Sequence, residues 1–329
     1  DTHEDSINLQ YPDGFTPDQE FLGRSVNATI TFDLPVKITI NALYQNNRSD
    51  VCTAPMLNIL NDRIPYNDYT STLLTSKFKK RLGDQSLLEV QLSYFNADNE
   101  RGDSWFEHDW KKWYDSTAVR NYTENHYEEL IVYNHDTNYG FFHDYNLLGF
   151  QFSRNGNLPN RYFHNQQQYV GAKADYQLKY TDHHEIKVGI DWRQHSIRHF
   201  DIAPSVMRRI NDKNYSYITT WNSIKEMPAD RWQEYGAVDG YGFDIYGKEI
   251  EKEKRYYDDE GNLLAIADAP KKPVNLSVYL QDQVTYNNLV LNAGLRIDYF
   301  DADDKNLKNP ANPAVMESAD FIADEAWED

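Results

Sequence analysis

The feature that most constrains the fold is a strict alternation of apolar and polar residues over long stretches. In the clearest run, apolar residues occupy every second position: Val26, Ala28, Ile30 and Phe32. A period of two places alternate side chains on opposite faces of a β-strand. The alternation returns in six further segments, 36–44, 87–96, 170–180, 186–192, 274–280 and 289–299. With a less regular strand at 72–81, the sequence predicts eight strands in an all-β fold.

The connections between these strands alternate between very short and very long. Residues 34–35, 82–85, 181–184 and 287–288 form tight turns, so the strands pair as four hairpins. Between the hairpins lie long loops at about 45–70, 97–164 and 199–273. We therefore divide the chain into a loop or leader at 1–24, barrel strands at 25–300, and an acidic loop or tail at 301–329.

Composition excludes several classes of protein. The formal net charge is −19, which argues against a nucleic-acid partner, because phosphate recognition needs a basic surface. With Cys52 as the single cysteine, the chain forms neither an internal disulfide nor a cysteine-based zinc site. No apolar run approaches the roughly 20 residues of a membrane-spanning helix. The histidines and carboxylates form no convincing metal site, so we predict no metal and no cofactor.

Alternation alone is compatible with a soluble β-sandwich and with a membrane barrel. Several strands reach ten or more residues, as a tilted crossing of a bilayer requires, whereas sandwich strands are shorter. Short turns at one end and long loops at the other are typical of outer-membrane barrels. We therefore predict an antiparallel transmembrane β-barrel segment with short periplasmic turns and long extracellular loops.

The polar faces of the predicted strands carry charges at mid-strand, which a water-filled lumen tolerates and a dry core does not. We expect these charges to face the lumen and to form a ladder across neighbouring strands: Lys173, Asp175, Lys187, Asp191, Arg193, Arg296 and Asp298. On the apolar faces, rings near strand ends suggest an aromatic girdle: Tyr176, Tyr180, Trp192, Tyr286 and Tyr299. The alternative is that tyrosine is simply a good strand former.

The last predicted hairpin resembles the TonB-dependent outer-membrane receptors. It reads Tyr-Leu-Gln-Asp at 279–282 and, after the turn, Asn-Ala-Gly-Leu-Arg-Ile-Asp-Tyr at 292–299. The hairpin strand at 185–192 is similar to the one that precedes it in such receptors. The resemblance implies a plugged barrel of about 22 strands in the outer membrane of a Gram-negative cell. Eight strands without a plug-like domain suggest a fragment of such a barrel rather than a small closed one.

The resemblance also implies a function. Such receptors take up a scarce nutrient of the siderophore, glycan or peptide class, and they are transporters rather than enzymes. The implied partners are outer-membrane lipid and lipopolysaccharide, the nutrient ligand, and the inner-membrane TonB energy-coupling complex, reached through a plug region that this chain lacks. No catalytic constellation of a nucleophile and a base is found in the sequence, so we predict that the chain is not an enzyme.

Aromatic residues in the second long loop are the best candidates for ligand contact. They lie beside charges, and their rings suit stacking on a sugar or on an aromatic ligand: Trp105, Trp110, Trp113 and Tyr114. Alternatively, the loop packs these rings into a small core of its own, on a short helix. A different class of function also stays open, namely a secreted or surface β-rich module for adhesion or glycan binding.

Overall fold

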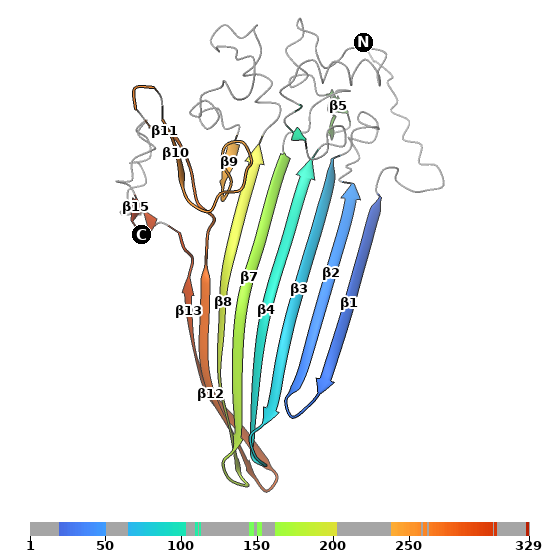
Figure 1. Cartoon of the computed structure of the whole chain (residues 1–329), viewed down its shortest axis with the longest axis vertical. Helices are drawn as coiled ribbons and strands as arrows, with labels where there is room; N and C mark the ends of the chain where they lie inside the picture. Colours follow the sequence, from blue (N-terminus) through green and yellow to red (C-terminus); the bar gives the residue numbers. More distant parts are fainter. Residues whose placement is uncertain are drawn as a thin grey trace, which may run out of the picture.

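The fold is a broad antiparallel β-sheet. The computed structural model describes residues 20–50, 65–102, 109–110, 112, 145–147, 150–152, 162–202, 238–257, 259–261, 263–304, 306–307 and 327–328. Eight long strands pair in the order β1-β2-β3-β4-β7-β8-β12-β13, and short β9 pairs with β8 (Figure 1). These eight are the strands that the alternation predicts, and the structure is an antiparallel β-barrel sheet.

The long strands have the following bounds: β1 Phe21–Asp33, β2 Lys37–Asp50, β3 Tyr66–Arg81, β4 Ser86–Gly102, β7 Tyr162–Lys179, β8 His184–Ile202, β12 Val274–Tyr286 and β13 Leu289–Asp301. The short strands are β5 Tyr145–Leu147, β6 Phe150–Phe152, β9 Val238–Tyr241, β10 Lys254–Tyr257, β11 Leu263–Ala267, β14 Asn306–Leu307 and β15 Trp327–Glu328. β5–β6, β10–β11 and β14–β15 form two-stranded sheets of their own. Within the described ranges, no helix is long and apolar enough to cross a membrane.

The four tight turns of the long hairpins lie at the same end of the sheet (Figure 1). Two of them contain a residue with a left-handed backbone, Gly83 with a φ of 87° and Asn287 with a φ of 51°. Glycine and asparagine tolerate this region better than other residues, which explains the sharp reversals at these positions.

The strands are longer than the alternation predicts, so the long connections are shorter. β2 continues to Asp50 and β3 begins at Tyr66, whereas the loop was expected over about 45–70. β4 and β8 likewise extend to Gly102 and Ile202. The reason is that ladder pairing needs only backbone groups, so it continues where both faces are polar and the alternation of side chains is lost.

One face of the sheet carries a continuous band of exposed apolar side chains. Members from neighbouring strands are 40–51% exposed: Ile40, Leu74, Leu92, Ile190 and Leu280. A soluble monomer rarely leaves such a large apolar surface uncovered. The band is therefore the lipid-facing side of the barrel sheet.

Aromatic rings border this band. On β12 and β13, Tyr286 lies beside the turn, and Tyr299 stands opposite Leu276 near the other end. The ten residue steps from Leu276 to Tyr286 span about 34 Å along the strand, which a tilt of roughly 40° reduces to about 26 Å, close to the height of the apolar band in such barrels. Trp192 lies in mid-strand rather than near a strand end, because β8 runs on above the band to Ile202.

Candidate functional site

The face opposite the apolar band carries the polar residues predicted from the sequence. All seven lie on this one face, on β7, β8 and β13, as the register through β12 shows: Lys173, Asp175, Lys187, Asp191, Arg193, Arg296 and Asp298. In one row, Lys173 is opposite Asp191, which in turn is opposite Ser277. We call this surface the lumen face.

The ion pairs among these residues run along the strands rather than across them. Lys173 Nζ lies 3.4 Å from a carboxylate oxygen of Asp175, two residues on in the same strand, although Asp191 is its direct cross-strand neighbour. Arg193 pairs in the same way with Asp191 at 3.4 Å, and Arg296 Nε lies 2.8 Å from Asp298. Cross-strand contact at Asp298 comes from the Ser277 hydroxyl, which donates to its carboxylate over 2.5 Å.

The lumen face extends onto strands where sequence analysis named no site residue. Glu89 on β4 accepts from Lys77 Nζ on β3 at 2.8 Å, and Lys79 Nζ lies 3.7 Å from its other oxygen. Sequence analysis missed the two lysines because the segment 72–81 alternates poorly. Pairing with the regular strand β4 assigns each of its residues to a face.

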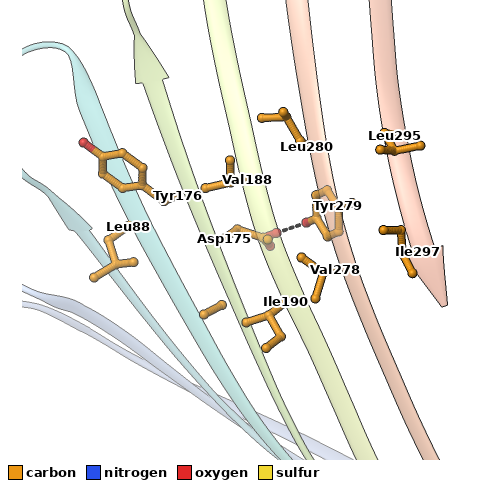
Figure 2. Close-up of a pocket in the computed structure, with 12 residues that line it drawn as sticks. Leu88, Asp175, Tyr176, Val188, Ile190, Val278, Tyr279, Leu280, Leu295 and Ile297 are labelled. Carbon is orange, nitrogen blue, oxygen red and sulfur yellow. Dashed lines mark hydrogen bonds between the residues drawn. The ribbon is translucent and has the colours of Figure 1, made fainter. Parts of the chain in front are cut away.

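On the lumen face, Tyr279 reaches across a neighbouring strand. Its ring crosses Gly189 on β8, and its hydroxyl donates to Asp175 on β7 (Figure 2). A methyl group added at Gly189 would lie 2.3 Å from Cζ of Tyr279, so only glycine leaves room for this ring. Two ammonium groups flank the ring, with Lys173 Nζ 6.0 Å and Lys187 Nζ 5.9 Å from its centroid.

The apolar side of the same strands has a hollow of about 480 Å³. Apolar side chains line most of it, among them Leu88, Ile190 and Leu295 (Figure 2). Asp175 and Tyr279, whose side chains belong to the lumen face, border it between the strands and are hydrogen-bonded to each other. The hollow therefore offers little to a polar ligand.

Above the band, the outward faces of β7 and β8 are covered by a segment that we call the outer flap, residues 242–251, which follows β9. Phe243 of the flap packs against Phe200 of β8, with ring centroids 5.9 Å apart. Trp110, from the connection between β4 and β7, packs on the same ring at 5.5 Å and on Tyr162 at 6.1 Å. The flap residue Ile245 is 1% exposed, so this outer layer has a small apolar core.

A polar cluster fastens the flap. His164 Nε2 lies 2.9 Å from an oxygen of Asp98, and Gln166 donates to Asp98 at 3.2 Å and to Glu249 of the flap at 2.8 Å. The buried Arg198 pairs with Glu251.

Two groups in this cluster have shifted pKa values. Burial favours the neutral ring of His164, but the hydrogen bond and charge of Asp98, helped by Glu100 and Glu249, outweigh it, so the pKa of His164 is raised. Burial, followed by the hydrogen bond that its hydroxyl donates to Glu100, raises the pKa of Tyr162.

The lumen face above the band also carries rings that sequence analysis did not single out. Phe95, Tyr169 and His195 form one cross-strand row on β4, β7 and β8. The Phe95 and Tyr169 rings stack at 5.3 Å, and Tyr169 and His195 lie 5.4 Å apart. The register of the paired strands reveals this row, because the three residues lie far apart in the sequence.

The predicted loop aromatics are only partly described. Trp110 is 5% exposed, with its ring packed against the sheet, so it offers no free face to a ligand. Trp105, Trp113 and Tyr114 lie outside the described residues, and their role in ligand contact stays a prediction. Across the described part of the chain, no group of three or more histidines, cysteines or carboxylates is arranged to hold a metal ion.

Comparisons with known proteins match this chain to a protein family. Residues 109–322, more than half of the chain, match the sequence profile of the family described as "TonB dependent receptor-like, beta-barrel". A solved structure, the outer membrane transporter YddB from Escherichia coli, aligns with a TM-score of 0.38 at 10% identity over 85% of this chain. The chain spans 28% of the length of that transporter. A comparison with curated proteins found no match.

Proposed function

Since the chain belongs to the TonB-dependent receptor-like β-barrel family, we propose that it forms part of the wall of an outer-membrane receptor that imports a nutrient. The observation that carries this proposal is the division of one sheet into two unlike faces. One face has exposed apolar side chains at every second position, and the other has a charged surface at the same height. Lipid on one side and water on the other satisfy both faces.

Membrane fractionation tests this location. The protein, expressed in a Gram-negative host with an export signal, should be recovered with the outer membrane and should need detergent for extraction. Its unboiled band on a denaturing gel should migrate differently from the boiled one, as expected of a folded barrel. Recovery as a folded, soluble monomer would instead favour the adhesion or glycan-binding module.

The nutrient belongs, in this proposal, to the siderophore, glycan or peptide class. Support comes from the row formed by Phe95, Tyr169 and His195, which lines the lumen face just above the band. Rings of this kind contact the flat faces of sugars and aromatic groups. The loop residues Trp105, Trp113 and Tyr114 are proposed to make the first contact outside.

Uptake should depend on the inner-membrane TonB complex, acting through a plug region. The decisive experiment compares growth on candidate nutrients in hosts with and without that complex. We expect growth on one class of nutrient to be lost when either the receptor or the complex is removed. Growth that survives loss of the complex would contradict energy coupling while leaving the membrane location intact.

A further inference from the structure

Lys187 is a cation on the lumen face that has no carboxylate partner within the described part of the chain. Among the described residues, no Asp or Glu oxygen comes within the 4.0 Å of an ion pair, whereas Lys77 and Lys173 both have such partners. The ring of Tyr279 lies near it, with its centroid 5.9 Å from the ammonium. An ionic group that faces the interior of a membrane protein without a partner commonly marks a pathway or a binding site.

The surroundings of Lys187 are held in place by a specific arrangement. Because residue 189 is glycine, the Tyr279 ring crosses β8, and its hydroxyl is bound by Asp175. One carboxylate oxygen of Asp175 accepts this hydrogen bond, and the other is paired with Lys173. The negative charge of Asp175 is therefore compensated locally. The ring is therefore fixed with one ammonium on β7 and another on β8 near it.

From this geometry we propose a carboxylate-binding station formed by Lys187, Tyr279 and Lys173 on the lumen face. The Lys187 ammonium donates to the bound carboxylate, and the Tyr279 ring contacts the carbon skeleton behind the carboxylate. Lys173 neutralises Asp175, which holds the tyrosine hydroxyl, so that Asp175 does not repel the bound carboxylate. The site rests on the proposed function, because it is reached only from a water-filled lumen. Two sources supply such a group: an acidic side chain of a polypeptide segment inside the barrel, and a carboxylate of the imported nutrient.

Carbodiimide coupling in isolated outer membranes tests the station. The reagent joins a carboxylate and an amine in contact as an amide, taking up the water that is lost, and mass spectrometry identifies the joined peptides. One arm contains no added acid and detects a polypeptide carboxylate. The second arm contains benzoate, whose ring suits Tyr279, and detects a small carboxylate. The amide between Lys77 and Glu89, 2.8 Å apart, is the internal control that the reagent reaches the lumen.

The station predicts coupling of Lys187 in at least one arm. In the first arm, the partner lies outside the described strands. In the second, Lys187 is benzoylated at least about fivefold more than the exposed Lys248, a ratio worth roughly 1 kcal/mol. Lys173→Gln and Tyr279→Leu should each reduce this ratio. Coupling of Lys187 to Asp175 or to another described carboxylate, or no excess over Lys248 in either arm, would overturn the station.

The carboxylate-binding station and the receptor function can be contradicted independently of each other. Gel mobility of the unboiled protein, measured on the same membranes, reports whether the barrel is folded and inserted. If it is inserted and the control amide forms, while Lys187 stays unmodified, the station is wrong and the receptor proposal stands. If the protein is absent from the outer membrane, the receptor proposal itself is wrong.

Discussion

At the scale of single residues, the pair formed by Gly189 and Tyr279 connects three strands of the lumen face. Gly189 belongs to β8 and Tyr279 to β12. The Tyr279 hydroxyl donates to the carboxylate of Asp175, which belongs to β7. A side chain at 189 would overlap the ring, so the identity of one residue determines where another can lie.

This pair predicts coupled effects of mutation. Gly189→Ala should displace the ring, break its hydrogen bond to Asp175 and lower the free energy of unfolding by about 1–3 kcal/mol. Tyr279→Phe removes the hydrogen bond alone and should cost about 1 kcal/mol. In the double variant with Tyr279→Ala, the added methyl group has no ring to displace. Urea unfolding in lipid or detergent should show that the free-energy costs of Gly189→Ala and Tyr279→Ala are not additive. Additive costs would mean that the ring does not lie over residue 189.

The sequence predicted the faces of residues better than their contacts. Alternation placed Lys173 and Asp191 on the same face, because side-chain direction depends only on parity along a strand. It did not predict that Lys173 pairs along its own strand with Asp175, because that choice depends on side-chain rotamers and on a tyrosine 104 residues away. The row of Phe95 and Tyr169 was missed for a related reason, since register across a long connection leaves no local signal.

At the scale of elements, a histidine that titrates lies between β7 and the outer flap: the His164 ring packs on Phe243 of the flap, with ring centroids 5.1 Å apart. His164 lies beside Asp98 on β4, and the carboxylates of Glu100 and Glu249 also act on it. Its pKa in the folded protein lies above the ordinary 6.5. Its stabilising contribution is therefore complete below pH 6.5 and is lost as the pH rises through the raised pKa.

Hydrogen exchange of the flap amides tests this pH dependence. After correction for the intrinsic effect of pH, protection of residues 243–250 should decrease as the solution is taken from mildly acidic to alkaline. His164→Gln should give weaker protection that does not change over that range. The pair of Arg198 with Glu251 provides a comparison, because arginine stays charged throughout. Protection that stays constant in the original protein would show that His164 does not fasten the flap.

At the scale of the whole molecule, the sheet separates two environments that respond oppositely to charge. Leu280 lies on the apolar face near the middle of the band, and Gln281 follows it on the lumen face. Leu280→Arg should destabilise the inserted protein by about 2–4 kcal/mol, the cost of a cation at the bilayer midplane, whereas Gln281→Arg should cost less than about 1 kcal/mol. Folding yield into lipid vesicles measures both. Equal costs would contradict the assignment of the faces.

The unequal lengths of the strands make the outer rim of this wall uneven. The tight turns lie at one end of the sheet. Because the strands range from 13 residues in β12 to 19 in β8, the additional residues of the longer strands lie at the opposite end. Six extra residues add about 20 Å along the strand. Among the described long strands, β3, β4, β7 and β8 therefore extend farther from the turns than β1 and β13.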